Sequence, residues 1–142
     1  MVISDNASGP TVGRNQWMRL GATAVAASVL AVLIVQYLAI TLWPEIALFK
    51  PLDSYLRSAI FTAVPAIIAT ALFAWLTRHR PHPERTFITI SVVVLLLSII
   101  PDYLLPVEYK TFLASSVTAF LHVVAALVIV GVLVSGYRRQ VG

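Results

Sequence analysis

The chain has 142 residues, of which 59% are hydrophobic and 11% are charged, and its mean hydropathy is +0.90. These values do not fit a soluble globular domain, so we expect most of the chain to lie in lipid. The absence of cysteine excludes disulfides, iron–sulfur clusters and thiolate zinc sites. The net charge of +4 does not indicate nucleic-acid binding, because the basic residues lie at the ends of apolar segments, where they act as topology signals.

The first 16 residues are polar and rich in Gly, Ser, Asn and Pro, which predicts a disordered cytoplasmic tail over 1–16. A first membrane span follows at about 20–42. This apolar run is longer than the core of a secretory signal, and no small-residue cleavage site ends it. We therefore interpret it as a span that stays in the mature protein.

Three further apolar segments predict spans at about 58–76, 86–105 and 112–134. A helix needs roughly 20 residues to cross a hydrocarbon core of about 30 Å. The second and third segments reach this length only when extended at their outer ends, which brings Asp102 into the outer interface. The sequence thus predicts an all-α membrane four-helix bundle over 17–138, followed by a short tail at 139–142.

The distribution of basic residues predicts the orientation of the bundle. Only three of the ten Lys and Arg residues fall in the first and third connections between spans, namely Lys50, Arg57 and Lys110. The other seven fall in the N-terminal segment, the middle connection and the C-terminus. By the positive-inside rule, both termini face the cytoplasm of a cell (inner or plasma) membrane, which requires an even number of spans.

The middle connection carries three arginines, Arg78, Arg80 and Arg85, within a short segment that also contains two prolines. Such a basic loop first indicates the orientation of the flanking spans. As a second interpretation, these arginines contact the headgroups of anionic lipids at the cytoplasmic face.

Small and polar residues predict which helix faces turn inward, because helices in lipid associate through close backbone packing and a few polar contacts. The four predicted faces are Thr23, Ala27 and Ala31 in the first span; Ala59, Ala63, Ala66 and Thr70 in the second; Ser91, Ser98 and Asp102 in the third; and Ser115, Thr118, His122, Ala125 and Ala126 in the fourth.

His122 is the residue in the spans that most needs an explanation. It lies ten residues from the start of the fourth span, about 15 Å deep and near the midplane. An ionisable group at this depth faces the bundle interior and is a functional-site hypothesis, and burial favours the neutral imidazole. Counting from the outer ends of the spans, Thr70 and Gln36 are its expected partners. Asp102 is expected to lie too near the surface for direct contact.

Three interpretations of His122 stay open. In the first, a hydrogen-bonded neutral imidazole specifies helix packing. In the second, His122 joins Gln36, Ser98, Thr118 and Asp102 in a polar path for a proton or small solute within an oligomeric transporter or channel. In the third, it is the single axial ligand of a haem or chlorophyll-type pigment. The first is favoured, so we expect no cofactor, metal or catalytic residue.

The order of spans and short motifs along the chain resembles that of a known family. A basic start and four spans are combined with LSIIPDYLLP, ending at Pro106, and SSVTAFLHVVAALV, which contains His122. Over about Arg19 to Arg138, the chain resembles a family of small four-helix bacterial integral membrane proteins of unknown function. The positions that match are Ser98 to Pro106 and His122. The resemblance implies a four-helix membrane fold and no established activity.

These observations together predict a non-enzymatic membrane protein with a structural, accessory or assembly role. The expected partners are the lipid bilayer, anionic lipids and either further copies of the chain or a larger membrane complex. The alternatives are the transporter or channel subunit and the pigment-binding subunit described above.

Overall fold

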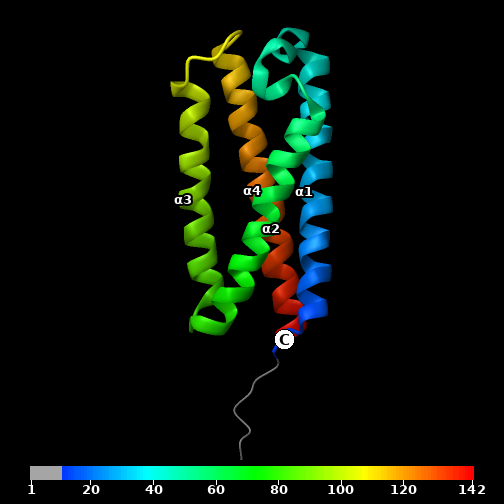
Figure 1. The fold of residues 1–142 in the computed structure, drawn as a ribbon, viewed down its shortest axis with the longest axis vertical. Coiled ribbons are helices and arrows are strands. Elements are labelled where there is room, and N and C mark those ends of the chain that lie inside the picture. Colours follow the sequence, from blue (N-terminus) through cyan, green and yellow to red (C-terminus); the bar gives the residue numbers. More distant parts are fainter. Residues whose placement is uncertain (1–10) are drawn as a thin grey trace, which may run out of the picture.

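The computed structural model describes residues 11–142, which form four long helices and two short 3-10 helices (Figure 1). The elements are α1 (Arg14–Leu42), η1 (Pro44–Leu48), η2 (Lys50–Leu52), α2 (Tyr55–His79), α3 (Pro83–Leu104) and α4 (Phe112–Val141). Even α3, the shortest long helix with 22 residues, is about 33 Å long. All four long helices are long and apolar enough to cross a membrane, which confirms the predicted all-α membrane four-helix bundle.

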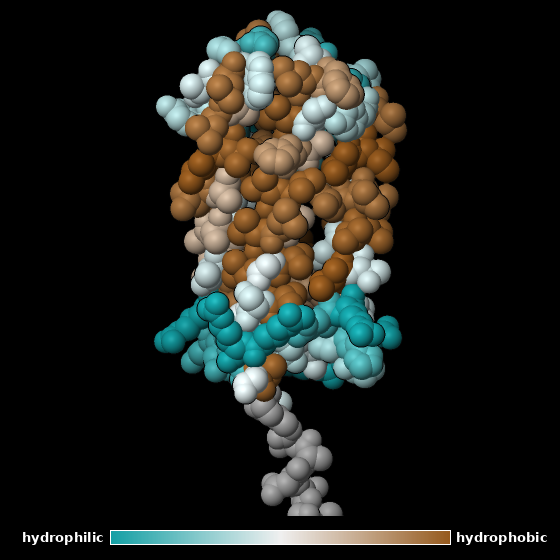
Figure 2. Space-filling view, turned by 180° about the vertical axis from the view of Figure 1, so that it is seen from behind, coloured by the Kyte–Doolittle hydropathy of each residue, from teal (hydrophilic) through white to brown (hydrophobic). Residues whose placement is uncertain are grey.

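The bundle has two different ends (Figure 1). We call the end formed by residues 44–54 and 105–111 the cap end. The terminal end holds the start of α1, the turn between α2 and α3, and the end of α4. Between these ends, Figure 2 shows a broad hydrophobic band over the molecular surface, as expected for a chain surrounded by lipid.

Two helices extend further than the predicted spans. The helix α1 begins at Arg14, where the backbone N–H of Gly13 donates to Oε1 of Gln16 over 2.8 Å. Residues 14–16 of the predicted tail are therefore helical, and the part of that prediction over 1–10 lies outside the described residues. The helix α4 continues to Val141, so most of the predicted C-terminal tail is also helical, because no proline interrupts it.

Aromatic packing joins the helices at the terminal end. The rings of Phe73 on α2 and Phe87 on α3 stack with their centroids 4.5 Å apart, and Trp17 on α1 meets Phe73 edge-on at 5.6 Å. Phe87 is the only residue of α3 that is fully buried. In addition, Nε of Arg138 donates to the Glu84 carboxylate over 2.8 Å, which ties the start of α3 to the end of α4.

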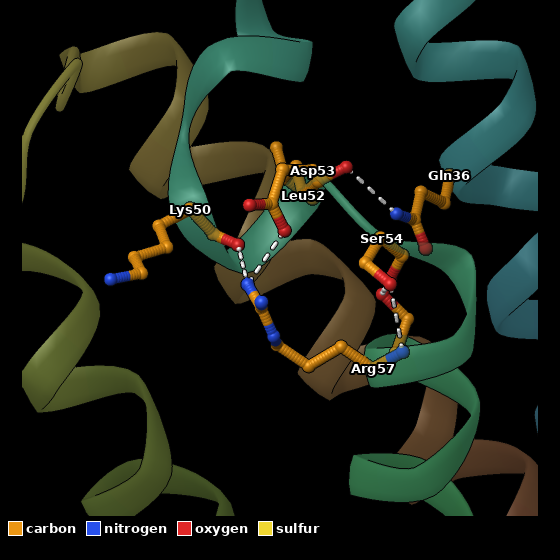
Figure 3. Close-up of polar contacts among 7 residues, drawn as sticks. Gln36, Lys50, Leu52, Asp53, Ser54 and Arg57 are labelled. Carbon is orange, nitrogen blue, oxygen red and sulfur yellow. Dashed lines mark hydrogen bonds and ion pairs between the residues drawn. The ribbon is translucent and has the colours of Figure 1, made fainter.

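A different arrangement fills the cap end. Ile46, Phe49 and Leu52, from the segment between α1 and α2, are buried against side chains of α1 and α4. No described residue of α2 or α3 belongs to this second core. The Gln36 side chain, itself fully buried, donates from Nε2 to the Leu52 carbonyl over 3.1 Å (Figure 3). The segment from Pro44 to Leu52, which we call the cap, thus takes a place beside α1 and α4.

The predicted inward faces are partly correct. On α4, Ser115 and Thr118 are buried as expected. On α1 the prediction is wrong, since Thr23 is exposed. The buried stripe of α1 is Trp17, Leu20, Ala24, Ser28, Val32, Gln36 and Ala39. Alanines occur on several faces of α1, so small size alone does not identify its contact face, which also uses large side chains.

Candidate functional site

A groove lies between α2 and α3, with α4 as its floor. Its volume is about 980 Å³, and it extends from Arg57 to Leu72, or roughly 23 Å along α2. Several lining side chains, including Phe61, Ile68 and Val94, are more than half exposed. The groove is therefore open to its surroundings, which in a membrane are lipid tails. We refer to it as the α2–α3 groove.

The cap provides the physical reason for this groove. At the terminal end, Phe73 and Phe87 bring α2 and α3 together. At the cap end, the buried core is made by the cap, α1 and α4 alone among the described residues. Because α2 and α3 contribute nothing to that core, no side-chain packing closes the space between them there.

The lining of the groove changes character along its length. Its cap half carries the polar and charged side chains Lys50, Arg57, Ser58, Thr62, Ser98, Asp102, Thr118 and His122. Its terminal half is apolar apart from Ser91, with Ile68, Leu72, Phe87, Ile90, Ile129 and Val130. The groove is therefore amphipathic along the bundle axis.

Asp102 and His122 meet in the cap half of the groove. Oδ2 of Asp102 lies 3.3 Å from Nε2 of His122, with 10% of the Asp102 side chain and 39% of the His122 side chain exposed. The expectation that Asp102 lies too far along the axis to contact His122 is therefore wrong. The carboxylate is almost buried, whereas the imidazole opens into the groove.

The error arose from counting depth from the end of each helix. Oγ of Ser115 donates to the Asp102 carbonyl over 2.7 Å, so the last turn of α3 lies level with a residue inside α4 rather than with its first residue. Side chains in a helix also lean towards its N-terminus. Because α3 and α4 are antiparallel, Asp102 leans towards the terminal end and His122 towards the cap end, so the two side chains approach each other.

The end of α3 is held firmly in this position. The Tyr103 hydroxyl donates to Oγ of Ser116 over 3.1 Å. Nζ of Lys110 donates to the carbonyl of Tyr103 (2.5 Å), which a helix C-terminus otherwise leaves unpaired, and to the carbonyl of Leu105 (3.1 Å), which also accepts from the Val107 N–H. Sequence reasoning did not find this role of Lys110. A lysine a few residues beyond a helix end was the available signal.

One oxygen of the Asp102 carboxylate is buried without a hydrogen bond among the described residues. Although Oδ2 is close to His122, it accepts no hydrogen bond from any group in residues 11–142 and is buried. A buried acceptor of this kind is costly unless a donor reaches it. Oδ2 itself has almost no exposed surface, so a molecule in the groove meets the imidazole of His122 and the exposed tenth of the Asp102 side chain instead.

The other predicted site residues divide into two groups. Ser98 and Thr118 line the groove, while their hydroxyls donate to Leu95 and Ala114 of their own helices. Gln36 and Thr70 do not line it and are not partners of His122. Gln36 holds the cap.

Thr70 instead marks a close contact between α1 and α2. Its hydroxyl donates to the Ala66 carbonyl over 2.8 Å. A Cβ atom added to Gly21 of α1 would lie 2.8 Å from Cγ2 of Thr70, so the two helices approach closely at this point. The role of Thr70 is therefore in packing.

Arg78, Arg80 and Arg85 are exposed at the terminal end, where Figure 2 shows a continuous hydrophilic belt. None of the three forms an ion pair within the part of the chain that the structure describes. Their guanidinium groups are free for external anions.

The chemistry of the groove follows from these contacts. Across residues 11–142, no three His, Asp or Glu side chains are grouped in a way that suits a metal ion. No hydrogen bond is formed by His122 with a serine or threonine hydroxyl within the same range. The arrangement is suited to hydrogen bonding and charge recognition of a molecule whose remainder is apolar.

The fold and groove define a multi-pass integral membrane protein with a lateral groove between two of its helices. The chain belongs to the family of unknown function DUF6069, whose model matches residues 11–139. This confirms the resemblance to a small four-helix membrane family of unknown function. Comparisons with curated proteins and with solved structures found no match.

Proposed function

We propose that this protein is a non-enzymatic accessory protein of the membrane that binds an amphiphilic molecule in the α2–α3 groove. The observation that carries the proposal is the 980 Å³ groove, in which the nearly buried Asp102 carboxylate lies beside the partly exposed His122 imidazole. This volume is at the upper end of the range typical of ligand pockets, roughly 300–1,000 Å³.

The distribution of polar side chains supports an amphiphile over a purely apolar ligand. The cap half offers hydrogen-bonding groups at Asp102 and His122, and the terminal half offers only aliphatic and aromatic walls apart from Ser91. A molecule with a polar head and a hydrocarbon tail satisfies both halves at once. Exposed lining residues on α2 and α3 leave a lateral entrance from the bilayer.

The hydrogen bonding around His122 supports binding without catalysis. A nucleophilic hydroxyl needs a base within hydrogen-bond reach. The hydroxyls of Ser98 and Thr118 donate to carbonyls of their own helices instead. We therefore propose that the Asp102–His122 pair recognises a polar group and does not transform it.

The test uses two neighbouring valines of α3. Val94 lines the groove and is 57% exposed, whereas Val93 does not line it and is 50% exposed. We expect Val94→Trp to fill the groove and to lose most of the lipid that copurifies with wild type in mild detergent. Val93→Trp should retain it. Native mass spectrometry measures the retained lipid, and equal retention by all three proteins would refute the proposal.

The same purified protein tests the pigment alternative. The His122 imidazole faces the groove, so a bound macrocycle would use this residue as its axial ligand. We expect a colourless protein. A Soret or far-red absorption band that is present in wild type and lost in His122→Leu would show that the ligand of the groove is a pigment and would contradict the amphiphile proposal.

A conducting role is the second candidate, because Ser98, Asp102, Thr118 and His122 all line one groove. In the terminal half of the groove, however, Ser91 is the single polar side chain of the lining, and its other side chains are apolar. A polar path within one chain therefore covers only the cap half. Conduction would then need a second copy or another protein. Proton flux into liposomes, measured together with the oligomeric state in mild detergent, tests this candidate.

We also propose that Arg78, Arg80 and Arg85 at the terminal end contact anionic lipids on the cytoplasmic side of the cell membrane. Their freedom from ion pairs within residues 11–142 supports this assignment. Arg80→Gln should reduce the binding of the protein to anionic vesicles in a salt-dependent manner and leave the lipid retained in the groove unchanged.

A further inference from the structure

The cap places a lysine at the entrance of the α2–α3 groove. Lys50 is exposed and lines the groove at its cap end. In Figure 3 its side chain extends away from Arg57, towards α3 on the far side of the entrance. Nζ of Lys50 forms no ion pair or hydrogen bond with any group in residues 11–142. An uncompensated ammonium group therefore stands at the entrance.

The backbone of Lys50 is held in place by a separate set of contacts. Arg57 donates from one guanidinium nitrogen to the Lys50 carbonyl over 2.5 Å and to Oδ1 of Asp53 over 2.6 Å (Figure 3). The hydrogen bond from Gln36 to the Leu52 carbonyl fixes the same segment to α1. The bonds to the Lys50 and Leu52 carbonyls use the backbone of the cap and leave the Lys50 side chain free.

One charged group at the entrance has no partner among the described side chains. Asp53 neutralises Arg57, with which it forms the ion pair. Asp102 also lines the cap half, where it lies beside His122, and no ion pair joins it to Lys50. The group without a partner is the Lys50 ammonium, which complements an anionic group.

We propose that the occupant of the α2–α3 groove is a membrane lipid with an anionic headgroup, and that Lys50 is the residue that selects the charge of that headgroup. This inference rests on the proposed function and names the class of its ligand. The anionic headgroup lies at the cap entrance against Lys50, a headgroup hydroxyl donates to Asp102, and the acyl chains follow the apolar half of the groove. A lipid is favoured over a free anion because the groove is mostly apolar and opens laterally.

The experiment uses vesicles that contain equal amounts of phosphatidylglycerol and phosphatidylcholine with the same acyl chains. After reconstitution and extraction in mild detergent, the retained lipids are measured by mass spectrometry. Lipid that is retained by wild type and lost in Val94→Trp defines the groove-bound fraction. This subtraction removes lipid held by the arginines of the terminal end.

We expect the groove-bound fraction of wild type to be enriched in phosphatidylglycerol. Lys50→Gln should lower this enrichment by about fivefold, the factor that corresponds to roughly 1 kcal/mol for an exposed charged contact. Lys50→Arg should restore it. Arg80→Gln is the control, since it removes the same charge at an exposed residue that forms no ion pair within residues 11–142 and does not line the groove.

Two results would overturn the inference in distinguishable ways. If Val94→Trp removes bound lipid but Lys50→Gln leaves the ratio of the two lipids unchanged, or lowers it no more than Arg80→Gln does, the amphiphile proposal stands and the role of Lys50 is wrong. If no lipid depends on Val94, both proposals fail.

Discussion

At the scale of single residues, the contact between Asp102 and His122 determines whether His122 is a packing residue or part of a polar site. A lone histidine in a span has a simple interpretation as a hydrogen-bonded packing residue. Paired with a nearly buried carboxylate on a neighbouring helix, it becomes part of a polar site that lines a groove. The pair also links the energetics of α3 to those of α4.

This linkage predicts non-additive effects of substitution. His122→Leu leaves the Asp102 carboxylate without a partner in a membrane helix, and we expect a loss of about 1–2 kcal/mol in the free energy of unfolding, less than for a fully buried pair because the imidazole is partly exposed. In an Asp102→Asn background, the same change should cost less. A double-mutant cycle in mixed micelles measures the coupling, and strictly additive effects would contradict it.

A second prediction at this scale concerns Gly21. Gly21→Ala places a methyl group 2.8 Å from Cγ2 of Thr70, a short β-branched side chain that has little freedom to move. We expect α1 and α2 to separate slightly, at a cost of about 1–3 kcal/mol. Gly131→Ala is the control, because a Cβ at Gly131 meets nothing within 4 Å. Thermal unfolding in detergent compares the two, and equal melting temperatures would argue against the close contact.

At the scale of elements, the cap is the part of the chain that shapes the site. The short helices η1 and η2 bury Ile46, Phe49 and Leu52 against α1 and α4, and they carry Lys50 to the groove entrance. The connection between α1 and α2 is therefore part of the hydrophobic core at the cap end. The apolar residues Ile46 to Phe49, which follow Pro44, were the signal for it in the sequence, but a short apolar run has no period that identifies its partner.

We predict that Gln36 controls the opening of the cap. Gln36→Leu removes the hydrogen bond to the Leu52 carbonyl and also removes Oε1, a buried acceptor that has no partner within residues 11–142. These effects oppose each other, so we expect global stability to change by less than about 1 kcal/mol. Opening of the cap should increase, seen as faster deuterium exchange over 44–54.

The control for this measurement is Thr41→Val. The Thr41 hydroxyl donates to the Tyr37 carbonyl of its own helix and not to the cap. Its loss should leave deuterium exchange over 44–54 at the wild-type rate. If Gln36→Leu exchanges no faster than Thr41→Val, the cap is held by apolar packing alone.

At the scale of the whole molecule, the two ends differ in charge. The start of α1, the turn after α2 and the end of α4 share the terminal end, which carries seven of the ten Lys and Arg residues. The cap end carries Lys50, Arg57 and Lys110. The positive-inside rule then predicts that the terminal end faces the cytoplasm and that the groove entrance at Lys50 faces the outer leaflet.

Single-cysteine labelling tests this orientation, since the chain has no cysteine of its own. In His82→Cys, which places the cysteine in the exposed turn of the terminal end, the thiol should be protected from an impermeant maleimide added to intact cells. In Glu108→Cys, which places the cysteine at an exposed position of the cap end, the thiol should be labelled. After permeabilisation both should react. The reverse pattern in intact cells would place the groove entrance on the cytoplasmic side.

Some features of the site were accessible from the sequence. The polar positions Ser98, Asp102, Thr118 and His122 stand out because polar side chains are rare and costly in lipid, and all four do line the groove. Gln36 and Thr70 stood out for the same reason and serve packing instead. Polarity in a span identifies a residue that needs a partner, but it does not identify the partner.

The sequence by itself determined the four spans, because the length and hydropathy of a span are local properties that must match the thickness of the bilayer. Four spans, an even number, also place the start of α1 and the end of α4 at the same end of the bundle. Only the tertiary structure decided that Asp102 meets His122, that the cap packs beside α1 and α4, and that α2 and α3 leave a groove. These features depend on how far each helix is shifted along its neighbour. That shift is set by contacts between distant segments, such as Ser115 with Asp102 and Gln36 with Leu52, which no local pattern records.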